Sequence, residues 1–254
     1  MKKLELIALE GIPLIEEGDN LVEIILTALE RNKISLSNGN VLVIAQKIVS
    51  KSEGRYASLN DIKPSQQAID LSRETDKDPK LVQLILNESK EVVRYRKGVI
   101  VVENILGLIH ANAGIDKSNI KSDSNNPRVL LLPLNPDKSA KEIRKEILKK
   151  TKKKVGIIIN DSSGRAWRNG IVGIAIGSSG AEVLSDLKGN LDLFGNTLEV
   201  TEVGKADEVA SAASLLMGQG KEALPVVVIK GLTESEDLNG AKALIRKPSE
   251  DLFR

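Results

Sequence analysis

The chain has 254 residues, of which 41% are hydrophobic, and this proportion predicts a folded protein with a sizeable core. Its 37 basic and 35 acidic residues nearly balance and only 2% of residues are aromatic, so we expect no nucleic-acid partner. The absence of cysteine excludes disulfides, thiolate metal sites and cysteine nucleophiles, and a single histidine, His110, excludes a histidine-cluster metal site.

Any bound metal must therefore have oxygen ligands, which favours magnesium, manganese or calcium. No apolar run approaches the roughly 20 residues that span a bilayer, and charged residues follow Met1 too soon for a signal peptide. We expect a cytoplasmic protein with no membrane partner. The basic cluster Lys149–Lys154 lies at the end of a predicted helix, which favours a solvated helix end over a nucleic-acid patch.

The first half of the chain predicts strands and helices in mixed order, from apolar periodicity, capping residues and prolines. The predicted elements are a strand over Lys3–Leu9, a loop over Glu10–Asp19, a helix from the Asn20 cap to about Arg31, a strand over Val41–Ala45, helices from Pro64 to about Arg73 and from Asp78 to about Lys90, and a strand over Gly98–Glu103.

The second half continues without strict alternation of strand and helix, which favours an α+β fold over a doubly wound sheet. Its predicted elements are a loop over His110–Asn119, a strand over Arg128–Leu134, a helix from Ser139 to about Lys150, strands over Val155–Ile159 and Thr197–Val203, a helix over Ala206–Met217, a strand over Val226–Ile229 and a polar surface arm over Thr233–Arg254.

The stretch Asn160–Gly170 follows the apolar strand and carries the densest set of polar groups. Asp161 and Ser162 would lie at a strand tip, where oxygen ligands for a hard cation commonly sit. Gly164 allows a tight turn, and two arginines that suit anionic oxygens flank the only tryptophan. An ordinary strand exit, with the aspartate capping a turn and the arginines solvated, explains the same residues, and the local sequence leaves both readings open.

Other strand ends offer small residues with a few oxygen or cationic groups. Lysines that follow a buried strand can bind a phosphate, and an aspartate or an amide oxygen in a loop can bind a hard metal. Each stretch also has an ordinary explanation as a surface lysine, an Asx-turn loop or a helix C-cap. Together the set fits a divalent metal bridging phosphates. The stretches are Gly11–Ile15, Gln46 with Lys47 and Lys51, Asn112–Asn119 with Asp116, and Met217–Gly220 with Gln219.

At these residues the chain resembles the coenzyme F-420 gamma-glutamyl ligase family. The matching stretches follow the family's order and cover nearly the whole chain. They are Glu10–Ile15, Ala45–Lys51, Glu88–Arg94, Ala111–Asn119, Asn160–Arg165 with Trp167 and Arg168, Asp192–Gly195, Ala206–Glu208, Leu216–Gly220 and Glu250–Arg254.

The resemblance implies a ligase that uses GTP to add L-glutamate, once or more and later through a gamma linkage, to coenzyme F-420-0. The acceptor's carboxylate would first be phosphorylated, and the amino group of glutamate would then displace phosphate. Two divalent ions (magnesium or manganese) and a potassium ion would assist. The alternatives are a ligase for a different carboxylate acceptor and a non-catalytic nucleotide-binding protein on the same fold.

The family's fold is implied as well: α+β, with mixed sheets and packed helices in a two-lobed arrangement that is neither Rossmann nor P-loop, in agreement with the missing phosphate-loop motifs. We expect one ligase domain over residues 3–232, with 233–254 as an arm of the same unit, and an intertwined homodimer.

The resemblance also assigns site residues by position. Asp116 and Asp161 would hold one metal and act in catalysis through it, and Ser162 and Gln219 would hold the other. Two departures concern these positions: Asn160 stands where many members have threonine, and Gln219 where some have glutamate. Arg165, Trp167 and Arg168 are candidates for holding the deazaflavin of the acceptor, with a structural role as the alternative, and no role is assigned to His110. The implied nucleotide contacts are Ile12, Pro13, Leu14, Ile15, Gln46, Lys47, Lys51, Asn119, Met217, Gly218, Gln219, Gly220, Lys221, Glu222, Ala223 and Leu224.

Overall fold

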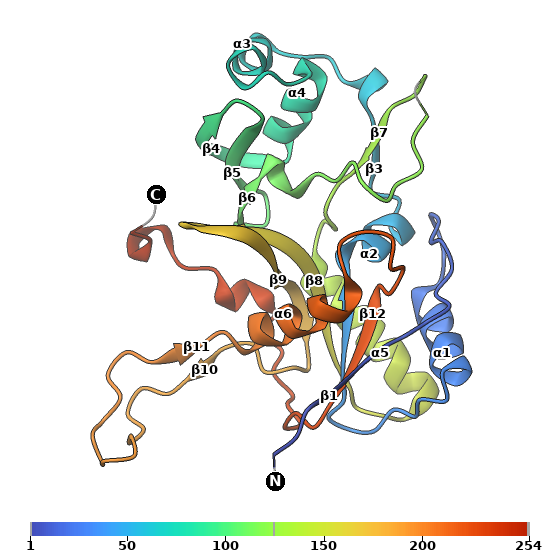
Figure 1. Cartoon of the computed structure of the whole chain (residues 1–254), viewed down its shortest axis with the longest axis vertical. Coiled ribbons are helices and arrows are strands. Elements are labelled where there is room, and N and C mark those ends of the chain that lie inside the picture. Colours follow the sequence, from blue (N-terminus) through green and yellow to red (C-terminus); the bar gives the residue numbers. More distant parts are fainter. Residues whose placement is uncertain (1, 124, 253–254) are drawn as a thin grey trace.

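A mixed five-stranded sheet forms the centre of the computed structural model, which describes residues 2–123 and 125–252 (Figure 1). Only β2 and β8, the third and fourth strands across the sheet, run parallel, and the other neighbours are antiparallel. Helices pack on this mixed sheet, so the expected α+β class is confirmed. In sheet order the strands are β1 (Glu5–Ala8), β12 (Val226–Lys230), β2 (Val41–Ala45), β8 (Gly156–Arg165) and β9 (Arg168–Ser179).

Each face of this sheet buries its own apolar core, because successive side chains of a strand point to opposite faces. In β2, Leu42 and Ile44 belong to the first core, whereas Val41 and Val43 belong to the second. Helices α1 (Leu21–Arg31) and α5 (Pro136–Thr151) cover the first face, and α6 (Lys205–Met217) covers the second (Figure 1).

A third core lies beneath a separate three-stranded sheet and two helices, at the top of Figure 1. Two further pairs of short strands complete the fold: β3 (Tyr56–Ser58) with β7 (Arg128–Leu130), and β10 (Ser185–Asp186) with β11 (Glu202–Val203). The elements of the third core are α3 (Gln66–Thr75), α4 (Pro79–Asn87), β4 (Ser89–Arg96), β5 (Val99–Asn104) and β6 (Ile109–Ala111).

Several predicted elements are confirmed closely. The strand Val41–Ala45 has the expected bounds, and α6 begins one residue before Ala206. The Asn20 side chain caps α1 by accepting a hydrogen bond from the backbone N–H of Glu23 at 3.1 Å. No helix in the described part of the chain is long and apolar enough to cross a membrane.

Other predictions were wrong where pairing between distant segments decides the structure. The helix expected to reach Lys90 ends at Asn87, because Ser89 already pairs with Asn104 in the three-stranded sheet. The strand expected over Thr197–Val203 is reduced to Glu202–Val203, since most of that segment lies in an exposed hairpin arm with no sheet to join.

Two element boundaries near α5 were also wrong. The strand expected to reach Leu134 ends at Leu130, which pairs with Tyr56, the first residue of its short antiparallel partner β3. The helix expected from Ser139 begins at Pro136, because Asn135 caps it by accepting from the Lys138 N–H at 3.0 Å.

The polar tail returns to the body of the protein. The carboxylate of Asp137, in the first turn of α5, accepts hydrogen bonds from the backbone N–H groups of Ala241 at 2.7 Å and Ser178 at 2.8 Å. Ala241 is buried in the second core, and short 3-10 helices span Ala241–Leu244 and Pro248–Glu250. Phe253 and Arg254, which end the stretch of family resemblance, lie outside the described residues.

Candidate functional site

The site begins where β2 ends and a short helix, α2 (Gln46–Ser52), follows without a break. This helix was not predicted. Gln46, Lys47, Ser50 and Lys51 are spaced so that positions four apart share a face, and a helix therefore gathers them on one side. The spacing was the available signal for α2, but Ala45 supplies no side-chain cap to mark the helix start.

Asp116 is bound to this helix by two side chains. The amide Nε2 of Gln46 donates a hydrogen bond to Oδ2 at 2.6 Å, and the Lys47 ammonium lies 3.1 Å from Oδ1. The Ser50 hydroxyl donates to the Gln46 amide oxygen at 2.9 Å, which aims the amide N–H groups at the carboxylate. Burial raises the pKa of Asp116 despite the nearby Lys47 charge.

Asp161 lies in β8 and is only 8% exposed. Its Oδ1 accepts the Ser162 backbone N–H at 2.8 Å. Burial, together with the charge of Asp116, raises the pKa of Asp161 to about 7. Two carboxylates therefore lie close together, and the charge of Lys47 beside Asp116 does not outweigh the burial of Asp161.

His110, to which the sequence assigned no role, lies beside Asp161. Its Nδ1 is 4.0 Å from Asp161 Oδ2, and the ring is 4% exposed. Neither ring nitrogen has a hydrogen-bond partner among the described residues. Burial lowers the pKa of His110 to about 4, so the ring is neutral near pH 7 and does not offset the carboxylate charge.

A second set of contacts joins α2 to two loops. The Lys51 ammonium donates to the Asn119 carbonyl at 2.7 Å, and the Asn119 side chain donates to the Gly220 carbonyl at 3.0 Å. Ser118, which the sequence reading did not single out, accepts from the Lys47 ammonium at 3.0 Å. Burial and the charge of Lys47 lower the pKa of Lys51, as expected for two cations held near each other.

The stretch Asn160–Gly170 is not a strand exit, and that expectation was wrong. β8 continues to Arg165 and turns into β9, because Asn160–Arg165 pairs with Arg168–Ala175. Trp167 is at the turn between the strands, 88% exposed and with a φ of 62°. Arg165 and Arg168 are exposed on either side of it.

The hairpin also decides which way Asp161 and Ser162 point. Neighbouring residues of a strand face opposite sides, so Ser162 shares the side of Asn160, whose amide donates to Ser214 of α6 at 3.1 Å. A Cβ built on Gly173, which pairs with Ser162, would meet Ser214 and Asn160 on that same side. Asp161 thus faces Asp116, and Ser162 faces α6.

The remaining predicted contacts lie on loops around this centre. Ile12 and Ile15 are buried in the first core, which leaves Pro13 and Leu14 exposed between them. Gly218 ends α6 with a φ of 69°, Gln219 is exposed, and only Gly220 of this loop is tied to the centre. Met217, the last residue of α6, is buried in the second core, Leu224 is half-buried, and Lys221, Glu222 and Ala223 are exposed.

The donor set fits a hard divalent cation that takes part of its coordination from a substrate. In the described part of the chain, no group of three or more histidine, cysteine, aspartate or glutamate side chains is placed to hold a metal. Asp116 and Asp161 supply two carboxylates, and magnesium and manganese commonly bind through one or two carboxylates plus phosphates and water. The metal and nucleotide assignments stay predictions.

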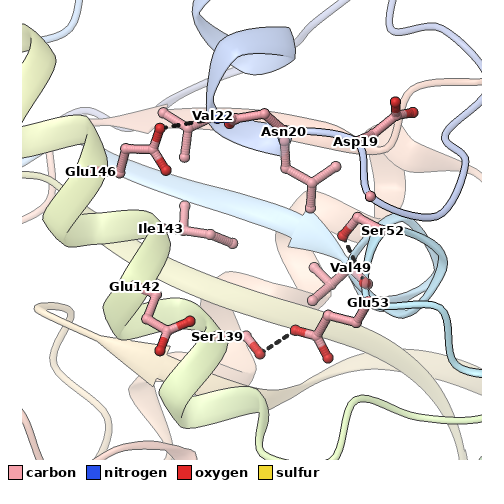
Figure 2. Close-up of a pocket in the computed structure, with 12 residues that line it drawn as sticks. Asp19, Asn20, Val22, Val49, Ser52, Glu53, Ser139, Glu142, Ile143 and Glu146 are labelled. Atoms are coloured by element: carbon pink, nitrogen blue, oxygen red, sulfur yellow. Dashed lines mark hydrogen bonds between the residues drawn. The ribbon is translucent and has the colours of Figure 1, made fainter.

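A pocket of about 310 Å³ between α1, α2 and α5 has an acidic lining (Figure 2). Four carboxylates line it, and Figure 2 shows two of them hydrogen-bonded: Ser139 donates to Glu53, and Asn20 donates to Glu146. A negative lining repels phosphate groups, so this pocket is a poor nucleotide site.

Comparison with known proteins gives a consistent result. The model of the F-420-0:gamma-glutamyl ligase family matches residues 11–231. The chain is 45% identical to the coenzyme F-420:L-glutamate ligase of Methanocaldococcus jannaschii, over 100% of this chain and 98% of that protein. It is 43% identical to the protein of the same name from Methanothermobacter thermautotrophicus, over 99% of both chains.

A third relative, the coenzyme F-420:L-glutamate ligase of Methanopyrus kandleri, is 42% identical over 100% of both chains. Matches of this length leave no large part of the chain outside the family's pattern. Together with the family model, they show that the chain belongs to the F-420-0:gamma-glutamyl ligase family.

Proposed function

We propose that this protein joins L-glutamate to coenzyme F-420-0 at the expense of GTP, through an acyl-phosphate intermediate. The observation that carries the proposal is the pair of neighbouring carboxylates, Asp116 and Asp161, with Gln46 and Lys47 bound to Asp116. Relatives at 42–45% identity over the full chain are named as ligases of coenzyme F-420 and L-glutamate, which supports the choice of substrates.

In the proposed reaction, an oxygen of the acceptor's carboxylate attacks the γ-phosphorus of GTP, and the bond to the β-phosphate oxygen breaks to release GDP. The amino group of glutamate then attacks the acyl carbon, loses a proton and displaces phosphate, leaving an amide. Phosphoryl transfer needs mainly positioning and charge neutralisation. Lys47 and Lys51 supply positive charge beside the carboxylate pair.

Bound magnesium or manganese, held by Asp116 and Asp161, would neutralise the phosphate oxygens during this transfer. Gln46 would hold the Asp116 carboxylate in place, and its own orientation is set by Ser50. Ser162 and Gln219 as ligands of a second ion, the assisting potassium ion, the nucleotide loops and the homodimer belong to the same proposal.

The test is an omission assay for GDP and phosphate. We expect release only when the acceptor, L-glutamate and a divalent metal are all present, and we expect a chelator to abolish it and added metal to restore it. A mixture with all components that forms no GDP would contradict the proposal. Release with another carboxylate acceptor, but not with coenzyme F-420-0, would favour the alternative ligase, and nucleotide binding without turnover would favour a binding protein.

A further inference from the structure

A second pocket of about 310 Å³ lies next to the candidate site and differs in charge from the acidic one. Two lysines, two polar residues and two apolar residues line it, and none of the lining residues is acidic. The lining residues are Lys77, Leu81, Asn112, Ile115, Lys117 and Ser118.

The pocket borders the candidate site through the segment that carries Asp116. This residue bridges to Leu130 like a short strand, so its side chain points one way while those of its neighbours, Ile115 and Lys117, point the other. Asp116 therefore faces Gln46 and Lys47, and its neighbours line the pocket. Ser118 belongs to both places, since it lines the pocket and accepts from Lys47 at 3.0 Å.

The polar lining consists of hydrogen-bond donors. The amide oxygen of Asn112 accepts the Ile100 N–H at 3.2 Å, so its N–H groups are the part available to a ligand. Because the Ser118 oxygen already accepts from Lys47, its O–H proton can be donated. Lys77 and Lys117 add ammonium groups, which donate only.

The two lysines of this pocket are not paired with acidic side chains in the described part of the chain. Among the described residues, no aspartate or glutamate lies within 4.0 Å of the ammonium groups of Lys77 and Lys117 in an ion pair. Partial burial and the charge of Lys117 lower the pKa of Lys77. An anion bound between the two lysines would offset their mutual repulsion and stabilise the charged form of the partly buried Lys77.

We propose that this pocket binds the carboxylates of an aliphatic acidic substrate, with Lys77 and Lys117 as the charged anchors. Leu81 and Ile115 would contact the methylene groups, and Ser118 would mark the opening toward Asp116. This inference rests on the proposed ligase function and assigns a place to one of its substrates. The shared chemistry has two sources, the incoming L-glutamate and the anionic arm of the acceptor, and the test separates them.

The test compares K77M and K117M with the charge-preserving variant K77R. The control is K63M, which removes the same charge from an exposed lysine elsewhere on the chain. Steady-state kinetics give a KM for each substrate, and calorimetric titration gives the affinity for L-glutamate and for coenzyme F-420-0. We expect K77M and K117M to weaken the binding of one carboxylate substrate by about tenfold or more, with kcat and the KM for GTP nearly unchanged.

A rise in the KM for glutamate identifies the amino acid as the occupant, and a rise for the acceptor identifies its anionic arm. K77R should retain most of the affinity, and K63M should behave like the wild type. Unchanged affinity for both substrates in K77M and K117M, or a loss confined to GTP, would overturn the inference.

If the wild-type protein showed no turnover, the ligase function would be contradicted, and the calorimetric titrations alone would test the pocket. In that case, weaker binding of L-glutamate or acceptor by K77M than by K63M supports the pocket. Equal binding by the two variants, or no binding to the wild type, refutes it.

Discussion

Asp161 combines an ionisable side chain with a position that is almost closed to water. It is 8% exposed, it faces the like charge of Asp116, and its pKa is raised to about 7. The pKa of Asp161 is higher in the folded than in the unfolded protein, so the protonated carboxyl group favours the folded state. This contribution to stability is fully present below about pH 4 and is lost as the pH rises through about 7. Near pH 8 the ionised carboxylate therefore opposes folding when no metal is bound.

The variant D161N tests this balance between function and stability. In chelator at pH 8, we expect D161N to be more stable than the wild type, by at most about 4 kcal/mol, because the neutral amide avoids the buried charge. The same variant should lose turnover by orders of magnitude. Urea unfolding measured with chelator and with added manganese separates the effects, since manganese should stabilise the wild type far more than D161N.

The exposed carboxylate Asp61 provides the control, and D61N should match the wild type in all of these measurements. If D161N kept full turnover, Asp161 would not be a metal ligand. If its stability fell in chelator at pH 8, the carboxylate would have structural partners beyond those described.

The sequence predicted the residue types of the site better than their contacts. Asp116, Asp161, Lys47 and Lys51 were expected near phosphates, and the structure brings them together beside α2. The sequence did not predict that Gln46 donates a hydrogen bond to Asp116, because that contact joins residues 70 positions apart.

His110 and Ser118 were missed for a related reason. A residue type states which hydrogen bonds are possible, whereas burial and neighbours are set by the packing of distant segments. The 4% exposure of His110 and the bond from Lys47 to Ser118 appear only after β6 and its loop are placed against α2 and β8.

At the level of elements, the hairpin β8–β9 holds Asp161 in place, and it depends on close contact with two helices. Gly177 of β9 packs against the first residue of α5: a Cβ built on it would lie 2.5 Å from the backbone carbonyl carbon and oxygen of Pro136. Backbone atoms cannot rotate away as a side chain can, so the helix would have to move. The glycine therefore sets the distance between the sheet and α5.

We expect G177A to lower the free energy of unfolding by about 1–3 kcal/mol, the usual range for an overpacked site. The matched control is G164A on the neighbouring strand, where an added Cβ would meet no atom within 4 Å. Urea denaturation of both variants gives the comparison. Equal loss of stability in G177A and G164A would show that the loss comes from replacing a strand glycine in general and not from contact with Pro136.

The same hairpin shows why strand ends were hard to predict. The apolar run Val155–Ile159 was read correctly as a strand, but polar residues follow it and suggested a loop. The strand continues because β9 pairs with it and α6 supplies polar partners, such as Ser214 for Asn160. Buried strands with their own apolar pattern, such as Val41–Ala45, were predicted with correct bounds because local sequence determines them.

On the scale of the whole molecule, a hairpin arm over 187–201 extends from the body, with β10 and β11 at its base (Figure 1). Near its tip Leu193 is fully exposed, and Phe194 is 90% exposed. Exposed apolar side chains gathered on one element commonly mark a contact surface. The homodimer proposed above would give this arm a partner in a second copy of the chain.

We expect the double variant L193D/F194D to shift the protein from dimer toward monomer, because a buried unpaired carboxylate opposes association. Light scattering after size-exclusion chromatography measures the mass directly. The control is L134D, which places one such carboxylate on a 62% exposed leucine outside the arm. Wild-type protein that is monomeric at micromolar concentration, or a dimer unaffected by the double variant, would contradict this role of the arm.

The central claim is that the carboxylate pair at Asp116 and Asp161 serves the ligation of glutamate to coenzyme F-420-0. Mass analysis of the acceptor after incubation with GTP, divalent metal and isotopically labelled L-glutamate tests it most directly. The claim predicts an acceptor heavier by one or more labelled glutamyl residues with the wild type, and an unchanged acceptor with D161N. GTP consumption by the wild type without any gain in acceptor mass would contradict it.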